Sequence, residues 1–299
     1  MLSLGGNNGR KKNQQGEGAG SAPRHGEITV RGVERVYRVP GQEPVWALKD
    51  CSLTVERGRL TALVGPSGCG KSTLANILAG YDQPSGGRVE IDGRPIKGPG
   101  RDRVMVFQET ALWPWMTVLK NTTFGPSMSG HIDQARAVKK AEELLRKVGL
   151  QDFKDKYPAQ LSGGMQRRAE LCRALIMDPR VMILDEPFRG LDVMTRELMQ
   201  VYLLKLYEEL GMTMLFITAE IDEALFLADR ILVMTNLPGH IKLTVEVDLP
   251  RPRDLKVVTS PAYLKIKGQV MTALYEEGSK TFAHLKNAYD TMSACREDN

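Results

Sequence analysis

The amino-acid sequence predicts an α/β fold, in which a largely parallel β-sheet carries helices on both faces. The first observation is that apolar, strand-like runs alternate with helical segments, which is the pattern of a parallel sheet. The second is a glycine-rich stretch, GPSGCGKST, that connects such a strand to a helix at residues 65–73. The third is a change to helical periodicity between about residues 109 and 165, which indicates an α-helical subdomain inserted into the core.

The N-terminal part of the chain predicts a tail followed by strands. Residues 1–25 are rich in Gly, Asn, Gln and Lys and nearly free of large apolar residues, so we predict a disordered tail. The segments EITVRGVERVYRV, CSLTVER and LTALVG are predicted strands, separated by PGQEP and ERG. KSTLANILAG predicts a helix that Gly80 ends, and GRVEIDG completes what we expect to be an antiparallel β-subdomain.

The later elements rebuild the core after the insertion. ARAVKKAEELLRKVGL (residues 135–150) has apolar residues at helical spacing and a charged opposite face, which predicts a helix. The core resumes with a helix over residues 163–176, the strand VMILD, a helix through TRELMQVYLLKLYEEL, and the strands MLFIT, RILVM and IKLTVEVD. We therefore predict one α/β domain over residues 26–254, with its helical subdomain at about 109–165. Residues 255–299 are predicted to form a polar, helical C-terminal extension, and the sequence does not indicate its role.

The composition is ordinary for a globular protein and limits the choice of partners. Hydrophobic residues make up 42% of the chain, charged residues 26%, and the net charge is +5. Lys and Arg are scattered without interleaved aromatic residues, so no nucleic-acid partner is expected, whereas a nucleotide or a membrane surface is compatible. No apolar run reaches the roughly 18 residues that span a bilayer, so any membrane association is expected to be peripheral.

The cysteines and histidines predict neither a metal site nor disulfides. They show no CxxC pair and no spacing of metal ligands, which fits a reducing cytosol, and the N-terminus shows no signal-peptide core. These residues are Cys51, Cys69, Cys172, Cys295, His25, His131, His240 and His284.

The stretch GPSGCGKST matches G-x-x-x-x-G-K-[ST] in its required setting between a strand and a helix. Its glycines let the backbone fold round phosphate groups, Lys71 would neutralise the β- and γ-phosphates, and Ser72 would ligate Mg²⁺. A glycine-rich turn with a chance lysine is the simpler alternative, which the strand, the spacing and the helix disfavour. We therefore predict a P-loop NTPase core that binds ATP through Gly65, Pro66, Ser67, Gly68, Cys69, Gly70, Lys71, Ser72 and Thr73.

The run VMILDEP (residues 181–187) is an apolar strand that ends in two carboxylates. Carboxylates in this place are costly unless they serve an ion. Asp185 suits a position beside Mg²⁺, and Glu186 suits the polarisation of an attacking water. The alternative, a strand end that caps a helix, is disfavoured about 110 residues after a P-loop.

The hexamer LSGGMQ (residues 161–166) places a Ser-Gly-Gly turn at the start of a helix, where amides and a hydroxyl group can meet an anion. Alone, such a hexamer is most often an ordinary N-cap. Between a P-loop and the DEP strand, and after a helical insert, it resembles the signature of ATP-binding cassette (ABC) ATPases. The resemblance implies a head-to-tail dimer, in which each ATP lies between the P-loop of one cassette and Ser162, Gly163 and Gly164 of the other.

Three further residues match the ABC pattern, and each has a simpler alternative. Tyr37, in RVYRV, is similar to the aromatic residue that stacks on adenine, or it is a plain strand aromatic. Gln108, in VMVFQET, is similar to the glutamine that reaches Mg²⁺ and the attacking water, or it is a polar strand end. Asp192, in RGLD, resembles the aspartate that couples the two sites across the dimer, or it is a helix cap.

Longer segments resemble one branch of this family, the importers of nitrate, sulfonate, taurine and bicarbonate. They are ALWPWMTVLKN, DEPFRGLDVMTR, IDEALFLADRILVM and LPGHIKLTVEVDLPRPR. The resemblance implies transmembrane permease subunits as partners, a solute-binding protein as an indirect partner, and a peripheral location at the cytoplasmic face of the membrane. Trp113 and Trp115 lie where such cassettes present a groove to the permease, unless both simply pack the helical subdomain. The solute cannot be read from this chain.

The sequence departs from the family pattern after the strand MLFIT. Family members usually have a His-Asp pair there, whose histidine contacts the γ-phosphate and holds the attacking water and the catalytic glutamate. Here the chain reads Ala219 and Glu220. The loss of one preorganised donor typically costs about 10²–10³ in rate. Glu170, in RRAELCRAL, is a second departure, whereas Glu186 is retained.

We therefore expect an ATP-hydrolysing subunit of an ABC importer whose hydrolysis is impaired but not abolished. Normal turnover despite Ala219, a regulatory cassette that only binds ATP beside an active partner, and an engineered exchange that traps ATP are the alternatives. A soluble ABC protein of DNA repair or translation is disfavoured, because no long coiled coil, zinc module or second cassette accompanies this one.

Overall fold

The protein is described here by a computed structural model that covers residues 25–130 and 133–297. Within these ranges, the side chains of residue 255 and of residues 280–297 are not described. The tail predicted over residues 1–25 therefore lies outside the described residues, apart from His25. The side chains of His131, His284 and Cys295 lie outside them as well.

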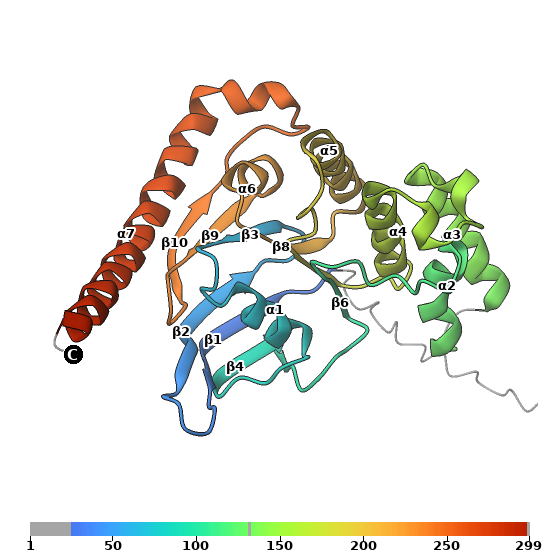
Figure 1. Ribbon diagram of the computed structural model, residues 1–299. Helices are drawn as coiled ribbons and strands as arrows, with labels where there is room; N and C mark the ends of the chain where they lie inside the picture. The colour runs from blue at the N-terminus through green and yellow to red at the C-terminus, as the bar shows by residue number, and fades with distance from the viewer. Residues whose placement is uncertain (1–24, 131–132, 298–299) are drawn as a thin grey trace, which may run out of the picture.

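A six-stranded sheet forms the centre of the molecule (Figure 1). In order across the sheet, its strands are β10 (Ile241–Glu246), β9 (Arg230–Met234), β3 (Leu60–Val64), β8 (Thr213–Thr218), β7 (Val181–Asp185) and β6 (Arg103–Val106). Every pair is parallel except β10 with β9. Strands β3, β7 and β8 are buried along their whole length, as strands covered on both faces should be. The predicted α/β fold is confirmed.

A second, four-stranded sheet is antiparallel, as predicted for the β-subdomain. Its order is β2 (Val45–Val55), β1 (Ile28–Tyr37), β4 (Gly86–Ile91) and β5 (Arg94–Pro95). In Figure 1 this sheet lies below the larger one, with helix α1 (Lys71–Ala79) between them. Gly80 ends α1 in a left-handed conformation with φ of 86°, which glycine adopts at little cost.

Helices α5 (Val193–Leu210) and α6 (Ile221–Leu227) cover the opposite face of the larger sheet. The alternation of side chains along β3 explains these layers. Ala62 packs in the cluster that includes α5 and α6, whereas the next residue, Leu63, packs in the cluster that includes α1. Both faces of the strand are thus apolar, which accounts for the unbroken hydrophobic run in the sequence.

The helical subdomain lies to the right of the sheet in Figure 1 and contains α2 (Val118–Ser129), α3 (Gln134–Lys147) and α4 (Gly163–Leu175). It has its own apolar cluster, which includes Leu112, Val118, Leu145, Leu150 and Cys172. The sequence predicted α3 within this subdomain and α4 as the helix with which the core resumes, but it did not predict α2. Helix α2 reads VLKNTTFGPSMS, in which a polar stretch and an internal Gly-Pro pair hide any helical period.

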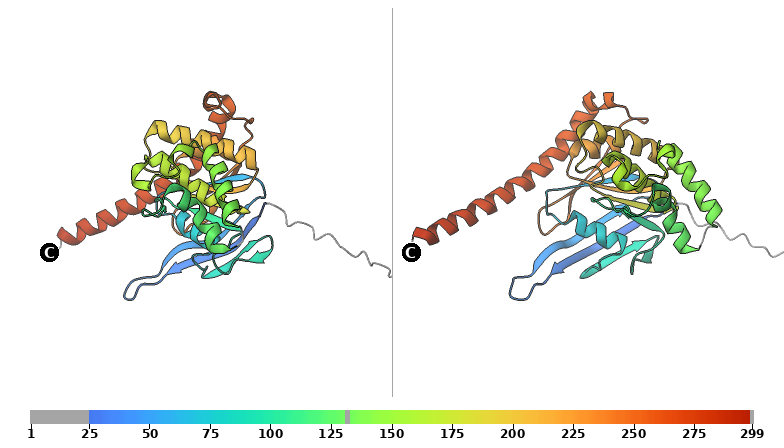
Figure 2. Two further views of the ribbon diagram at one scale, coloured as in Figure 1. Left: turned by 90° about the vertical axis from the view of Figure 1, so that its right-hand side faces the viewer. Right: turned by 45° about the vertical axis from the view of Figure 1, so that its right-hand side comes forward.

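The C-terminal extension consists of a short 3₁₀ turn, η3 (Leu255–Thr259), and the long helix α7 (Pro261–Glu297). Helix α7 passes along β10 and then continues beyond the body of the molecule (Figures 1 and 2). Its first turns are tied to α6, because the Tyr263 hydroxyl group and the Lys267 ammonium group both donate to the carboxylate of Asp222 at 2.7 Å. Among the described residues, none of the helices has the length and apolar character needed to cross a bilayer.

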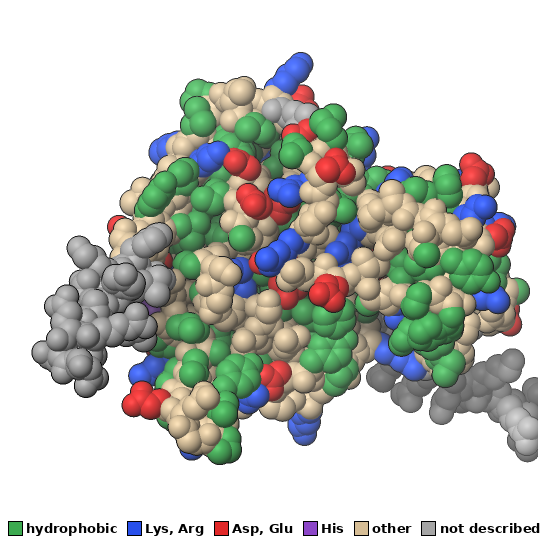
Figure 3. Space-filling view, in the orientation of Figure 1, with side chains coloured by type: hydrophobic (Ala, Val, Ile, Leu, Met, Phe, Trp, Pro, Cys, Tyr) green, Lys and Arg blue, Asp and Glu red, His purple; other side chains and the backbone are tan. Residues whose placement is uncertain are grey.

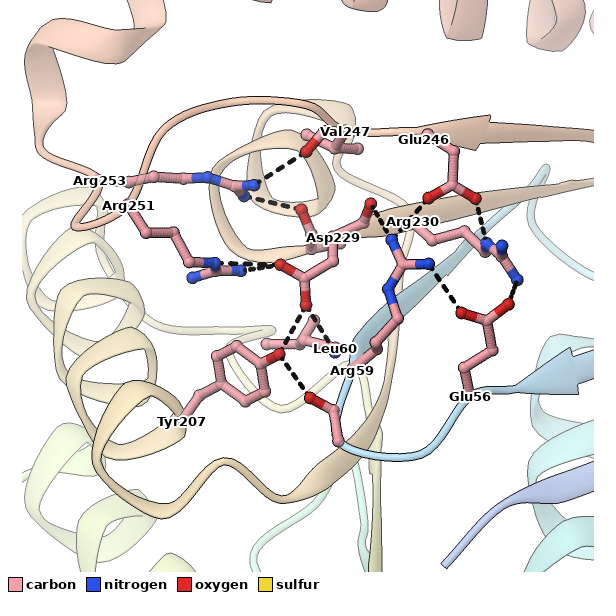
Figure 4. Close-up of polar contacts among 12 residues, drawn as sticks. Glu56, Arg59, Leu60, Tyr207, Asp229, Arg230, Glu246, Val247, Arg251 and Arg253 are labelled. Atoms are coloured by element: carbon pink, nitrogen blue, oxygen red, sulfur yellow. Dashed lines mark hydrogen bonds and ion pairs between the residues drawn. The ribbon is translucent and has the colours of Figure 1, made fainter. Parts of the chain in front are cut away.

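A polar cluster round Asp229 joins the larger sheet to the helices and to the C-terminal segment (Figure 4). The Asp229 carboxylate accepts hydrogen bonds from the Leu60 amide at 2.9 Å, the Tyr207 hydroxyl group at 2.6 Å and the Arg251 guanidinium at 2.7 Å. Burial raises the pKa of Asp229, but these hydrogen bonds outweigh it and hold the pKa below its usual value. One carboxylate thereby fixes the start of β3, helix α5 and residue 251.

Arg253 fixes the end of α6 in a similar way. Its guanidinium is buried and donates to the carbonyl groups of Leu225, Phe226 and Ala228. Burial and the nearby charge of Arg251 lower its pKa to about 10. A cation at this place is favourable, because the last carbonyl groups of a helix lack partners and carry partial negative charge.

The Asp229→Asn variant should be less stable by about 3 kcal/mol at neutral pH, since the amide cannot replace the charge that Arg251, Tyr207 and Leu60 contact. Because the folded-state pKa of Asp229 is lowered, its contribution is complete above the unfolded-state pKa of about 3.9 and is lost as the pH falls below it. Urea unfolding from pH 7 to pH 3 measures this difference.

The exposed Asp248 provides the matched control. Asp248→Asn should change the free energy of unfolding by less than about 0.5 kcal/mol. Equal effects of the two substitutions, or a difference that does not shrink at low pH, would contradict this role of Asp229.

Candidate nucleotide-binding site

The candidate site lies where the carboxyl ends of three neighbouring parallel strands meet. Residues 65–70 follow β3, Asp185 and Glu186 lie at the end of β7, and residues 218–220 lie at the end of β8. The register brings these ends level, because Val64 pairs with Thr218 and Asp185 with Ile217. Ligands of open α/β sheets bind at this edge. In Figure 3, acidic and basic side chains gather in the middle of the molecule, between the smaller sheet and the layer of α5 and α6.

The backbone of residues 65–70 is compact and leaves no room for larger side chains. A Cβ on Gly65 would lie 2.8 Å from Sγ of Cys69, and one on Gly70, with φ of 102°, would lie 2.8 Å from the Ala47 carbonyl oxygen. Lys71 is buried, and its ammonium group donates to the carbonyl oxygens of Gly65 and Pro66 at 2.8 Å. The loop thus wraps a cation at the N-terminus of α1, where anions are favoured.

Asp185 offers the kind of ligand that Mg²⁺ prefers. Its side chain is 6% exposed, and its Oδ1 atom is buried with no hydrogen-bond partner in the described part of the chain. Burial raises the pKa of Asp185, and the Ser72 hydroxyl group only partly offsets this. A buried oxygen that lacks a donor, beside a serine hydroxyl group, fits a hard divalent cation held by one carboxylate and phosphate oxygens.

Glu186 has an unusual backbone conformation, with φ of 43°. Residues other than glycine rarely adopt this region, at a cost of about 1–3 kcal/mol, and such residues cluster at functional sites. The backbone is held here by the Glu186 amide, which donates to the Ile217 carbonyl oxygen at 2.9 Å, and the carboxylate pairs with Arg189 at 2.8 Å.

Ala219 and Glu186 line the same cavity, which has a volume of about 260 Å³ and also borders Ser67 and Arg189. The turn that holds Ala219 is fixed by Thr218, whose hydroxyl group lies 2.6 Å from Oε2 of the buried Glu223 and accepts from the Glu220 amide at 3.0 Å. Burial raises the pKa of Glu223. His240 borders a different cavity, with Thr235 and Lys242, which Ser67, Gly68 and Cys69 also line.

Helix α4 fixes the loop that carries Gln108. The buried Arg167 guanidinium donates to the carbonyl oxygens of Phe107 at 2.7 Å and Gln108 at 2.6 Å, and it pairs with Glu170. Glu170 in turn accepts from the Ala111 amide at 3.0 Å. Burial raises the pKa of Glu170, although Arg167 opposes this. The Gln108 side chain itself is exposed.

Sequence reasoning noted Glu170 only as a departure from a pattern and missed Arg167 and Arg189. Opposite charges three residues apart were the available signal in both cases, since such residues are neighbours on a helix or across a turn. The contacts with residues 107–111 could not be read from the sequence, because they join segments about 60 residues apart.

The predicted signature turn lies against the start of α5. Ser162 caps α4 by accepting from the Met165 amide at 3.4 Å, and a Cβ on Gly164 would lie 2.6 Å from Cγ2 of Thr195. Asp192 caps α5, and its hydrogen bonds with Thr195 lower its pKa. The helix-cap alternatives for Ser162 and Asp192 therefore hold in the structure, and a further role across a dimer stays a prediction.

Tyr37 lies at the end of β1 and is 40% exposed. Its hydroxyl group lies 3.4 Å from a carboxylate oxygen of Asp82, and the Arg35 guanidinium lies 4.7 Å from its ring centre. These contacts lie beyond the C-terminal end of α1, at the other end of that helix from Lys71. Its stacking on adenine stays a prediction.

Comparison with known proteins decides the family. Residues 48–189 match the family described as ABC transporter. The chain is 42% identical over 255 residues to an uncharacterized ABC transporter ATP-binding protein of Methanocaldococcus jannaschii. The match covers 85% of this chain and 94% of the relative. The chain belongs to the ATP-binding proteins of ABC transporters. The predicted family is thus confirmed.

Other relatives of this cassette carry more specific names. A taurine import ATP-binding protein of Roseobacter denitrificans is 45% identical over 72% of this chain and 80% of its own length. A nitrate import ATP-binding protein of Synechococcus elongatus is 40% identical over 84% of this chain, which spans only 38% of that relative. A solved dimeric ATP-binding cassette bound to ADP and Pi is 31% identical, with a TM-score of 0.66, and covers 75% of this chain and 100% of its own.

The Glu170→Ala variant should lower the free energy of unfolding by about 3–5 kcal/mol, because it leaves the Arg167 charge buried without its partner. It should also increase amide hydrogen exchange in residues 107–111, which the pair holds. Urea unfolding and exchange mass spectrometry measure the two effects.

A double variant, Arg167→Met with Glu170→Ala, is the comparison. Removing both charges should recover part of the stability but not the protection of residues 107–111. A double variant no more stable than Glu170→Ala alone would argue against the pair.

Proposed function

We propose that this chain is the ATP-binding and ATP-hydrolysing subunit that powers an ABC importer of a small solute. The observation that carries the proposal is the meeting of Lys71, Asp185 and Glu186 at the carboxyl edge of one parallel sheet. The names of the relatives, which are nitrate and taurine import ATP-binding proteins, support import of a small solute of this kind. The sequence resemblance adds sulfonate and bicarbonate to the candidate solutes.

In this proposal the chain's own residues divide the work of hydrolysis. Gly65 to Thr73 cradle the phosphates, and Lys71 neutralises their charge. Ser72, Asp185 and Gln108 would hold Mg²⁺, which when bound supplies charge neutralisation between the phosphates. Glu186 accepts the proton of the attacking water as the bond between the γ-phosphorus and the bridging oxygen breaks, which yields ADP and phosphate.

Two copies, or this chain and a second cassette, would form the working unit. Ser162, Gly163 and Gly164 of one cassette, with Asp192, would cover the ATP on the P-loop of the other. In support, neither described cavity beside Ser67 is lined by residues 162–164 of the same chain. A solved cassette that is 31% identical to this chain is dimeric, which supports a dimer.

The exposed Trp115 supports contact with permease subunits. Its side chain is 65% exposed, and its ring centre lies 5.2 Å from that of Trp113. Trp113 packs inward against Phe124 and under Arg173. Of the two tryptophans, Trp113 therefore packs the helical subdomain, while Trp115 remains exposed. Tryptophan is enriched among the residues that contribute most to binding at protein interfaces. This contact would place the chain at the cytoplasmic face of the membrane, and a solute-binding protein would act indirectly.

The second candidate is a regulatory cassette that binds ATP but hardly hydrolyses it. Ala219 favours it, because a methyl group cannot donate a hydrogen bond to a γ-phosphate.

The test is the ATPase activity of the chain assembled with its permease, as it stands, with Ala219→His and with Glu186→Gln. Ala219→His should raise turnover about tenfold or more, since it restores a donor, whereas Glu186→Gln should abolish turnover. Turnover no higher than that of Glu186→Gln in the unchanged chain would support the regulatory candidate instead.

A further inference from the structure

Arg189 lies beside the reacting end of the proposed site. Its Nη1 atom lies 2.8 Å from Oε2 of Glu186. Both side chains border the cavity that Ser67 and Ala219 also line. A cation therefore contacts the proposed catalytic carboxylate in the cavity where the expected histidine is missing.

The local backbone holds Arg189 in this position. Residues 186–189 form a turn, in which the Arg189 amide donates to the Glu186 carbonyl oxygen at 3.1 Å. Phe188, between them, is buried, and its ring centre lies 5.7 Å from that of Phe216 on β8. The turn is thus anchored in the core, and it brings residue 189 back over residue 186.

The other cations near the cavity have different contacts. Arg196 donates to the Leu191 carbonyl oxygen at 3.2 Å, and its charge acts on Glu223. Lys71 donates to carbonyl oxygens of its own loop. The ion pair with Glu186 thus belongs to Arg189.

We propose that Arg189 is a positioning residue for ATP hydrolysis, which takes over from the histidine absent at position 219 the task of holding Glu186. The proposal rests on the function proposed above. In the hydrolytic step Glu186 must face the water whose oxygen bonds to the γ-phosphorus, and it must receive that water's proton as ADP leaves. A carboxylate that turns freely faces the water less often, and small misplacements of catalytic groups reduce rates strongly.

The exposure of the pair makes the proposal testable. Arg189 is 62% exposed and Glu186 17% exposed on their side chains. Exposed ion pairs add little to folding stability, so Arg189 variants should fold normally. An effect on turnover would then reflect the position of Glu186 and not the loss of the fold.

The experiment measures kcat and KM for ATP in the assembled transporter with Arg189→Ala, Arg189→Lys, Ala219→His and the Arg189→Ala/Ala219→His double variant. Arg189→Ala should lower kcat about 10- to 100-fold with KM for ATP unchanged, and Arg189→Lys should recover part of the loss. Ala219→His should raise kcat by a larger factor in the Arg189→Ala background than in the unchanged chain, because one donor then replaces the other.

Two controls separate the possible failures. Arg57→Ala removes another exposed arginine, whose ion pair with Asp92 lies outside the cavity, and it should leave kcat unchanged. If Glu186→Gln abolishes turnover while Arg189→Ala leaves kcat unchanged or raises it, or changes only KM, the role of Arg189 is overturned and the proposed function stands. If Glu186→Gln retains full turnover, the proposed function itself fails.

Discussion

The burial of a carboxylate at the end of β7 is the constraint on which the rest of the site depends. Asp185 closes a strand that is buried throughout, where an ionised group is costly unless it is paired. The surrounding structure offsets this cost only in part, through Ser72 and Lys71 on the neighbouring α1. The N-terminus of that helix and the end of β7 must therefore stay close to each other. The fully buried parallel strands β3, β8 and β7 form the rigid frame that keeps them together.

Helix α4 connects two regions that sequence motifs treat separately. At its start, Gly164 lies against Thr195 of α5. Further along the helix, Arg167 donates to the Gln108 carbonyl oxygen and Glu170 accepts from the Ala111 amide, which fixes the loop that carries Gln108. A shift of α4 thus moves the signature turn and the Gln108 loop together. This rigid link uses a buried ion pair, which specifies one geometry because either charge alone would be expensive.

Much of the fold could be predicted because buried parallel strands and a P-loop leave strong local patterns. Strands β7 and β8 contain the unbroken apolar runs VMIL and MLFI, and GPSGCGKST needs both its spacing and its flanking elements. Helix α2 could not be predicted, because Gly125 and Pro126 interrupt its weak period. The contacts of Arg167 and Arg189 were missed for another reason: they depend on how a turn and a helix are placed in space, which residue types alone do not determine.

The short helix α6 gives the C-terminal extension a mechanical link to the cavity at Ala219. One end of this seven-residue rod follows the turn of residues 218–220, and the other is gripped by Arg253. Asp222, in its first turn, is tied to Tyr263 and Lys267 of α7. The C-terminal extension and the turn that carries Ala219 are therefore joined through one short helix and its contacts with α7.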